Sequence, residues 1–295
     1  MLKICILIPI YNRLEVTKKG IASLKMSLER YYATHEPHIK FDIIVVDDNS
    51  TDGSPEWIKA AHPDVVVLHG NGNLWWTGSI DLGARFAVHS QHCSHILLWN
   101  DDLECDKDYF ANLGSILEQN RELRSSILVS KIYWSDTRDV LFNFGCLFNS
   151  KTGKKTLIGS NERDGEKYNK LTEVDWSGGM GTLIPADTLL KINFFDPINF
   201  PQYHGDSDMF LRAKQQGYKV FAVPSLKLFN DRNTTGVKQI KKFADLKAFF
   251  TSNRSNYNLA QNIEFTKRHC TSIIAWPYLV KTYMKVLLIS MRNFT

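Results

Sequence analysis

The sequence lacks several features that would assign it to a common class. Its 295 residues carry a formal net charge of only +5, from 36 basic and 31 acidic side chains, which is too small a bias to indicate nucleic acid as a partner. The five cysteines include no pair at the two-residue spacing of a zinc or redox motif, so we interpret them as reduced thiols of a cytoplasmic protein. With 43% hydrophobic residues, the chain is not a disordered one.

Long apolar runs are missing as well. The first residues, MLKICILIPIYN, are apolar over too short a stretch for a signal peptide and suit a buried strand instead. Near the C-terminus the longest uncharged stretch, Cys270–Val280, has 11 residues, and Lys281 and Lys285 interrupt the apolar residues after it. A membrane-spanning helix needs about 20 apolar residues, so we expect none in this segment.

Three common site types are missing too. No His-x-x-x-His pair with a glutamate occurs, which argues against a zinc hydrolase. The segment PIYN at 9–12 contains no glycine, so the fingerprint of a nicotinamide-dependent oxidoreductase is missing. The acidic run at 101–108 does not match a calcium loop, because Lys107 and Leu113 stand where the loop glycine and the terminal glutamate belong.

What the sequence does contain is a series of apolar strands alternating with helical patterns. We expect strands over Leu2–Ile8, Phe41–Val46, Val65–Leu68, His95–Trp99, Ile127–Trp134, Val174–Pro185 and Lys219–Pro224. We expect helices over Glu15–Tyr32, Pro55–Ala61 with Ser54 as N-cap, Ser79–His89, Tyr109–Asn120 and Asp206–Gln216. Such alternation is typical of a parallel sheet with helices on both faces. The polar segment Lys151–Lys170 predicts an exposed hairpin or loop, and the last 65 residues predict a helical tail.

Polar residues follow each of the first four strands, where ligands bind in sheets of this kind. Two acidic pairs, Asp47–Asp48 and Asp101–Asp102, stand there, and paired acids repel each other unless a ligand compensates them. Mg²⁺ or Mn²⁺ usually takes one or two carboxylates together with substrate phosphates. We therefore assign Asp101 and Asp102 to a metal site, and Asp106 and Asp108 to capping of the next helix.

Five motifs carry a family resemblance. In chain order they are IPIYNR (8–13), VVDDNSTDGS (45–54), NDD (100–102), SGGMG (177–181) and GDSDMFLR (205–212). Over about residues 2–230 this set resembles glycosyltransferase family 2, of the GT-A fold. The segment NGNLWWTGSIDLG at 71–83 further resembles bacterial rhamnosyltransferases and other transferases of polysaccharide assembly.

The resemblance implies an α/β architecture: a mostly parallel, Rossmann-like sheet flanked by helices. It implies a catalytic domain at 1–230, with a nucleotide-binding half at 1–102 and an acceptor half at 103–230, followed by a helical tail at 231–295. The implied reaction is an inverting transfer of a sugar from a nucleoside diphosphate donor to an acceptor hydroxyl of a glycan or a lipid-linked glycan.

The resemblance also assigns residues to the donor. Asp48 contacts the pyrimidine ring, and because a carboxylate accepts the N3–H of uracil and thymine alike, UDP and dTDP donors both stay open. Tyr11 stacks on the base, with a core role at the strand end as the alternative. Asp102 binds Mn²⁺ or Mg²⁺, while Asn230 and Asp231 stand where some relatives place a histidine ligand. The remaining donor-side residues are Pro9, Arg13, Trp76 and Asp101. Arg13 is placed at a phosphate, with an exposed arginine at the helix start as the alternative, and Trp76 has plain packing as its alternative. Asp101 is placed near the ribose.

On the acceptor side, Asp206 is the implied base, with the N-cap of the following helix as the alternative role. Gly205 replaces the glutamate that often precedes this base in the family. The residues assigned to the acceptor or the transferred sugar are Trp75, Trp176, Gly178, Gly179 and His204. The alternative for Trp75 is plain packing, and the favoured alternative for His204 is a surface histidine. We expect Asp208 to be structural and Arg212 to pair with an acid.

The tail shows an amphipathic pattern. Lys281, Lys285 and Arg292 fall within about 40° of each other on a helical wheel, against an apolar face with Trp276 and Tyr278 as interface anchors. We expect the tail to lie on the inner face of the cell membrane, near a lipid-linked acceptor. Docking on the catalytic core and contact with a second copy in a homodimer remain alternatives. The other function left open is a non-catalytic sugar-nucleotide or glycan-binding module, which needs Asp48 but neither Asp102 nor Asp206.

Overall fold

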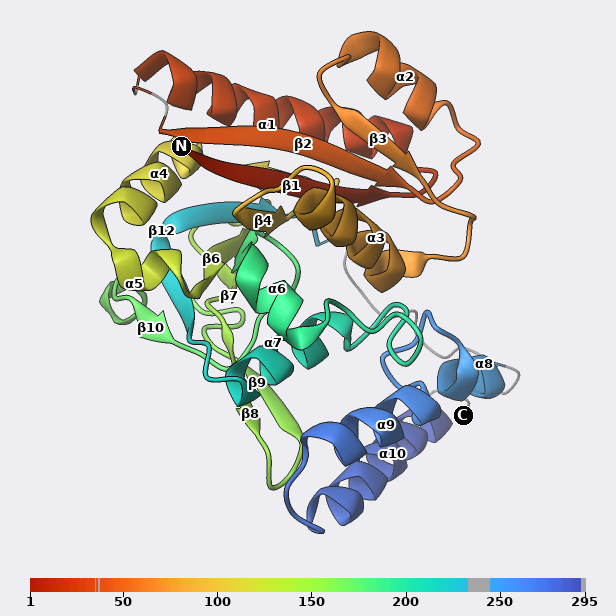
Figure 1. Cartoon of the computed structure of the whole chain (residues 1–295). Coiled ribbons are helices and arrows are strands. Elements are labelled where there is room, and N and C mark those ends of the chain that lie inside the picture. The colour runs from red at the N-terminus through yellow and green to blue at the C-terminus, as the bar shows by residue number, and fades with distance from the viewer. Residues whose placement is uncertain (35, 37, 233–244, 293–295) are drawn as a thin grey trace.

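A single twisted sheet forms the centre of the molecule (Figure 1). The computed structural model describes residues 1–34, 36, 38–232 and 245–292. The order of the strands is β10-β12-β6-β11-β4-β1-β2-β3, with β5 paired to β12 and β7 to β6. The strands are β1 Leu2–Ile10, β2 Ile39–Asp47, β3 Val66–His69, β4 His95–Leu98, β5 Leu103–Cys105, β6 Ile127–Trp134, β7 Leu141–Asn143, β10 Thr172–Glu173, β11 Thr182–Pro185 and β12 Val220–Asn230.

Most of the long strands run in one direction. β1 is parallel to β2 and β4, β2 is parallel to β3, and β12 is parallel to β6. β11 lies antiparallel between β4 and β6, so β6 and β12 share the direction of β1. The predicted mostly parallel sheet is therefore confirmed. The carboxyl ends of the parallel strands and the start of β11 all open at one rim of the sheet.

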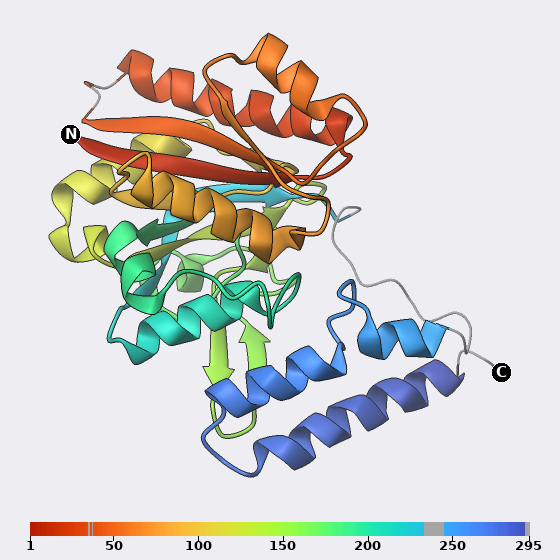
Figure 2. The ribbon, with the colours of Figure 1, turned by 45° about the vertical axis from the view of Figure 1, so that its right-hand side comes forward.

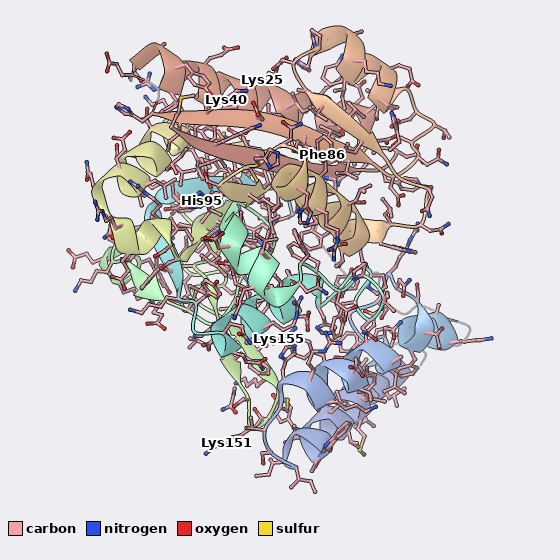
Figure 3. All side chains as sticks on the ribbon, viewed as in Figure 1. Lys25, Lys40, Phe86, His95, Lys151 and Lys155 are labelled. Carbon is pink, nitrogen blue, oxygen red and sulfur yellow. The ribbon has the colours of Figure 1, made fainter. Side chains whose placement is uncertain are left out.

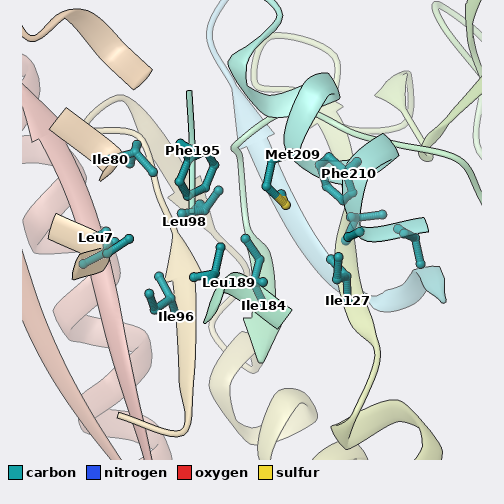
Figure 4. Close-up of a cluster of buried hydrophobic side chains, with 14 of the residues drawn as sticks. Leu7, Ile80, Ile96, Leu98, Ile127, Ile184, Leu189, Phe195, Met209 and Phe210 are labelled. Carbon is teal, nitrogen blue, oxygen red and sulfur yellow. The ribbon is translucent and has the colours of Figure 1, made fainter. Parts of the chain in front are cut away.

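Helices cover both faces of the sheet, because the buried strands are apolar on both sides. On β1, Cys5 and Leu7 face one hydrophobic cluster while Ile4 and Ile6 face the other. The first cluster is closed by α3 Trp75–His89, α6 Ala186–Ile192 and α7 Gly205–Gln215 (Figure 4). The second is closed by α1 Leu14–Thr34, α2 Ser54–Ala61 and α4 Tyr109–Gln119, and α4 continues into α5 Arg121–Arg124.

Four predicted boundaries were wrong. α3 begins at Trp75 rather than Ser79, so the paired tryptophans start a helix. Only Thr182–Pro185 of the segment 174–185 is a strand, and β12 extends to Asn230 across an irregularity between Val223 and Lys227. The N-cap of α2 is Gly53, in the left-handed region at φ 85°, rather than Ser54.

The polar segment around 150 forms the predicted hairpin. Its strands are β8 Cys146–Asn149 and β9 Lys154–Leu157, and a short 3₁₀ helix, η1, follows at Glu166–Tyr168. Cys146 pairs with Trp176, which attaches the hairpin to the segment leading into β11. The hairpin therefore stands beside α7 rather than apart from the sheet (Figure 2).

The described part of the tail is helical, as predicted: α8 Asp245–Thr251, α9 Leu259–His269 and α10 Ala275–Arg292. Both views show α9 between α10 and the body of the molecule (Figures 1 and 2). Phe265 of α9 packs against Phe200, and Arg268 pairs with Asp196 at 2.9 Å. α9 therefore docks on the core, as the alternative for the tail predicted. Among the described residues, no helix has the length and apolarity that a membrane crossing requires.

Candidate active site

The loops that follow β1 and β2 are tied to each other by their polar side chains. Asn12 donates its backbone N–H to Ser50 Oγ at 2.9 Å, and its own Oδ1 accepts from the Thr51 N–H at 2.8 Å. Asp52 accepts from the N–H of Leu14 at 2.8 Å and from the hydroxyl of Ser54 at 2.6 Å. Much of the YNR and DDNSTDGS motifs is therefore explained by the closure of these loops.

Asp48 is buried and holds the loop that follows β3. Its Oδ1 accepts from Gly72 N at 2.8 Å, and its Oδ2 accepts from Leu74 N at 2.9 Å and Trp75 N at 3.2 Å. Gly70 must be a glycine, because a Cβ there would stand 2.5 Å from Asp48 Oδ1. A carboxylate offers about four acceptor positions, and three are taken here, so one position is left for a ligand such as a pyrimidine ring.

Arg13 bridges the acidic pair that follows β4. Its guanidinium lies 2.8 Å from Asp101 Oδ1 and 3.0 Å from Asp102 Oδ2. Asp101 also accepts from Thr17 Oγ1 at 3.2 Å and is therefore turned toward α1. Burial raises the pKa of Asp101 to about 7, although the Arg13 charge opposes that shift. Arg13, predicted at a phosphate, thus first neutralises these two acids.

Asp102 offers one oxygen to a cation. Its Oδ1 is buried and makes no hydrogen bond within the described part of the chain, while Arg13 holds its Oδ2. The described residues contain no group of three or more His, Cys, Asp or Glu side chains suited to a metal. A single carboxylate oxygen completed by substrate phosphates is a set that Mg²⁺ or Mn²⁺ accepts. The residues present therefore fit a divalent cation that arrives together with a diphosphate.

Pro9 and Tyr11 lie at the end of β1, on the same rim of the sheet. The Tyr11 side chain is 48% exposed, so it is free to stack on a base and is no core residue. Pro9 pairs with Val46 of β2, beyond the last pairing of β1 with β4 at Leu7, where its missing N–H costs the sheet little.

Trp76 connects the acidic pair to the SGGMG loop. Its indole N–H donates to Asn100 Oδ1 at 3.2 Å, and its ring lies over Gly179, where a Cβ would stand 2.0 Å from a ring carbon. The neighbouring Gly178 faces Asp206, since a Cβ there would stand 3.8 Å from Asp206 Oδ2. The SGGMG loop therefore lies between Trp76, which bonds to Asn100, and Asp206.

The neighbours of Gly205 explain why a glycine stands where the family often has a glutamate. A Cβ at Gly205 would stand 2.1 Å from Thr77 Oγ1, because α3 packs its first turn against the start of α7. The Thr77 N–H also donates to the Pro201 carbonyl at 2.9 Å. The α3–α7 contact thus occupies the space that a longer side chain would need.

Asp206 is not the helix cap. The N-cap of α7 is His204, and Asp206 lies within the first turn, where its Oδ1 accepts from Ser207 N at 2.6 Å. Burial raises its pKa above the ordinary value, and the positive charge of Lys155 acts in the opposite direction. Asp206 Oδ2 makes no hydrogen bond to any described residue.

Sequence reasoning missed Lys155. It belongs to a cluster of side chains that we call the Lys155 pocket, made up of Lys155, Trp176, His204, Asp206 and Phe265. Lys155 Nζ donates to His204 Nδ1 at 2.7 Å and lies over the rings of Phe265 and Trp176 at 3.9 and 5.0 Å. His204 is half-buried here, so its surface alternative was wrong. A lone lysine in a polar hairpin gives no signal of this position in the sequence.

The second acid of the α7 motif holds the tail. Asp208 is fully buried, pairs with Arg212 at 2.8 Å, and receives Arg268 at 3.0 Å and His269 at 2.9 Å from α9. The structural role expected for Asp208, and the pairing expected for Arg212, are thus seen. Trp75 also contacts the tail, through Arg254 at 5.7 Å from its ring.

Comparisons with known proteins show the family and the fold of the chain. A hexosyltransferase of low-salt glycan biosynthesis, Agl10 of Haloferax volcanii, is 22% identical over 61% of this chain, which spans about half, 55%, of that protein. Two solved structures are similar in fold. GalNAc-T7 with UDP, GalNAc and Mn²⁺ has a TM-score of 0.60 and 12% sequence identity, and the match covers 97% of this chain and 57% of that one. A mannosyltransferase of Pyrobaculum calidifontis with GDP-Man and Mn²⁺ has a TM-score of 0.54 and 13% identity, and the match covers 96% of this chain and 69% of that one. The model of glycosyl transferase family 2 matches residues 5–161, more than half of the 295 residues, so the chain belongs to this family, with a GT-A fold.

Proposed function

We propose that this protein is an inverting glycosyltransferase that moves a sugar from UDP or dTDP to an acceptor hydroxyl during glycan or surface-polysaccharide assembly. The observation that carries the proposal is the position of the SGGMG loop between Trp76, which bonds to Asn100, and Asp206. The residue before the acidic pair and a half-buried carboxylate thus lie on the two sides of one loop. A rhamnosyl donor is a narrower form of this proposal, based on the NGNLWWTG segment.

In this proposal the donor lies along the loops after β1, β2 and β4. Tyr11 stacks on the base, the remaining acceptor position of Asp48 takes the pyrimidine N3–H, and Asp101 lies near the ribose. Pro9 and Trp76 complete the donor side, while Arg13 turns from the acidic pair to a phosphate. Asp102 Oδ1 would hold Mn²⁺ or Mg²⁺, which when bound would neutralise the charge that develops on the diphosphate.

The transfer itself is a displacement with inversion. Asp206 Oδ2 takes the proton of the acceptor hydroxyl while that oxygen bonds to the anomeric carbon. The bond from the anomeric carbon to the diphosphate breaks, and its electron pair leaves with the diphosphate oxygen. Trp75, Trp176, Gly178, Gly179 and His204 line the side from which the acceptor arrives.

The test is turnover of a panel of uridine, thymidine and guanosine diphosphate sugars, with and without Mn²⁺, scored by diphosphate release. The loss of a base is expected to lower turnover by about 10²- to 10⁴-fold in Asp206→Asn. Asp102→Asn is expected to abolish the response to Mn²⁺. Asp139→Asn, 63% exposed, is the control and should resemble the wild type. Retained turnover in Asp206→Asn would remove its role as the base, whereas nucleotide-sugar binding without turnover in the wild type would favour the non-catalytic binding module.

The tail completes the proposal as a contact with the membrane. α10 exposes Val280, Met284 and Leu288, at 57%, 57% and 60%, beside the exposed Lys281 and Lys285. Apolar side chains flanked by lysines suit an interface with anionic lipid, which would bring the enzyme to a lipid-linked acceptor. The side chain of Arg292, the third member of the predicted basic stripe, lies outside the described residues.

Flotation with vesicles containing anionic phospholipid tests this contact. Met284→Glu with Leu288→Glu should reduce flotation, while Leu190→Glu, at a position 48% exposed on α6, should leave it unchanged. Equal flotation of both variants would rule out the membrane role of α10. If light scattering shows a dimer for the wild type and a monomer for Met284→Glu with Leu288→Glu, the apolar face of α10 instead contacts a second copy of the chain.

A further inference from the structure

The Lys155 pocket contains a half-buried cation that neither the family motifs nor the proposed donor site explains. Lys155 lies on β9, where the hairpin meets α7, whereas Lys151 extends from the far end of the same hairpin (Figure 3). Lys155 Nζ donates to Ser207 Oγ at 2.6 Å and to His204 Nδ1 at 2.7 Å. Phe265 and Trp176 cover the rest of the ammonium group.

The other titratable groups around Lys155 leave one anion for it to balance. Asp208 is already met by Arg212, Arg268 and His269. Burial raises the pKa values of the Cys146 and Cys270 thiols, which keeps both neutral. Burial and the Lys155 charge hold the pKa of His204 well below its ordinary value, so its imidazole is neutral as well. The remaining group is Asp206, whose charge favours the protonated state of Lys155.

The charge of Lys155 acts on Asp206 although the two side chains form no ion pair. No ion pair joins Lys155 to a carboxylate among the described residues, and two of its three N–H donors go to a hydroxyl and an imidazole. A direct ion pair would use an acceptor position that a base needs for its substrate. The bonds to Ser207 and His204, on either side of Asp206 in the chain, hold the charge near this half-buried carboxylate without an ion pair. The charge lowers the cost of ionising Asp206 and leaves its Oδ2 open.

We infer that Lys155 is a positioning residue that keeps Asp206 ionised at neutral pH while the tail, through Phe265, keeps water away from the pair. This inference rests on the proposed role of Asp206 as the base. Burial lowers the pKa of Lys155 to about 8, so the support it gives Asp206 weakens as pH rises through that value.

The first test is the pH profile of kcat/KM in Lys155→Met. Loss of the charge should move the acid limb to higher pH by about 1 unit or more. At pH values below the limb kcat/KM should then fall about tenfold, and at pH values above it kcat/KM should change little. Lys155→Arg, which keeps the charge, should keep the wild-type limb. Lys154→Met is the matched control, because Lys154 precedes Lys155 on β9 and is exposed. An acid limb in Lys155→Met at the wild-type position, or an equal loss at every pH, overturns the inference.

The second test needs no turnover. The Cε resonance of Lys155, followed by NMR against pH, reports its pKa directly. In Asp206→Asn that pKa should fall by about 1 unit or more, because a nearby negative charge is lost. An unchanged titration of Lys155 shows that the two groups are not coupled, even if Asp206 is the base. A shifted titration together with full turnover in Asp206→Asn instead removes the base role and, with it, the role of Lys155.

Discussion

The strand-end loops and the Lys155 pocket are built in different ways. In the loops after β1, β2, β3 and β4, polar side chains bond to backbone groups of the same or the neighbouring loop, as Asp48 does with three N–H groups. In the Lys155 pocket, side chains from the β9 hairpin, α7 and the tail meet across more than 100 positions of sequence. The first region is held together by short motifs, and the second exists only when distant elements have docked.

The largest expected effect comes from the contact that docks the tail. Asp208→Asn leaves Arg212 and Arg268 without a buried counter-charge, so the free energy of unfolding should fall by about 3 to 5 kcal/mol. Urea unfolding at pH 7 measures it, with the exposed Asp139→Asn as the control. A loss below about 1 kcal/mol would mean that the tail docks by its other contacts, such as the Arg268–Asp196 pair and the packing of Phe265, and the comparison of the two regions would lose its main support.

The same variant has a definite pH dependence. Burial raises the pKa of Asp208, but the hydrogen bond from His269 and the charges of Arg212 and Arg268 outweigh it, so the pKa lies below its ordinary value. A depressed pKa stabilises the fold above the unfolded-state value and loses that effect as pH falls through the folded-state value. The difference between wild type and Asp208→Asn should therefore be constant at pH 5 to 7 and shrink below about pH 4. A difference that is the same at pH 3 and pH 7 would contradict the ionised state of Asp208.

The next effect tests the strand-end loops. Asp48→Asn replaces an acceptor oxygen by an NH₂ group that faces backbone donors, so the free energy of unfolding should fall by about 2 to 4 kcal/mol. The KM for the donor should rise as the loop at 70–75 loosens. Asp64→Asn makes the same chemical change at a side chain that pairs with Lys25 and is 66% exposed. It should lower the free energy of unfolding by less than about 1 kcal/mol. Equal effects of the two variants would show that the loop does not depend on Asp48.

A smaller effect is expected where the two regions meet. Gly179→Ala would place a Cβ 2.0 Å from a carbon of the Trp76 ring, and the resulting strain should cost about 1 to 3 kcal/mol. Gly165→Ala is the control, because nothing lies within 4 Å of a Cβ there and the backbone is extended at φ −172°. Trp76→Leu together with Gly179→Ala should recover part of the loss. If it recovers none, Trp76 is not what requires a glycine at 179.

The sequence was informative about the first hundred residues for a physical reason. Strands such as Leu2–Ile10 are buried on both faces and are therefore continuously apolar, which makes the parallel sheet readable without knowing its partners. The start of α3 was misplaced because Trp75 has a positive φ of 57° and follows a loop held by Asp48, a tertiary cause that no local pattern contains. The end of β12 was missed for a similar reason, since its extension pairs with the short β5.

The candidate site, like the fold, was predictable where its residues follow strands and not where they depend on contacts between distant elements. Asp48, Asp101 and Asp102 follow strands, so the rule on strand ends locates them. Lys155 stands in a polar hairpin whose pattern is that of an exposed segment, and its contact with His204 depends on how β8 and β9 attach beside Trp176. The sequence also could not show that Arg13 neutralises the acidic pair, because the partner of this arginine is set by the docking of α1 against β5 and the residues just before it.

The smallest effect tests whether the tail reaches the strand-end loops at all. Arg254 lies 5.7 Å from the Trp75 ring and is exposed, so Arg254→Met should lower the free energy of unfolding by about 0.5 to 1 kcal/mol. Lys247→Met, at an exposed position on α8, removes the same charge without a ring contact and should have a smaller effect. In a Trp75→Leu background the Arg254→Met effect should vanish, because its partner is then gone. A loss that persists there would separate the tail from Trp75 and leave Asp208 as the link between the two regions.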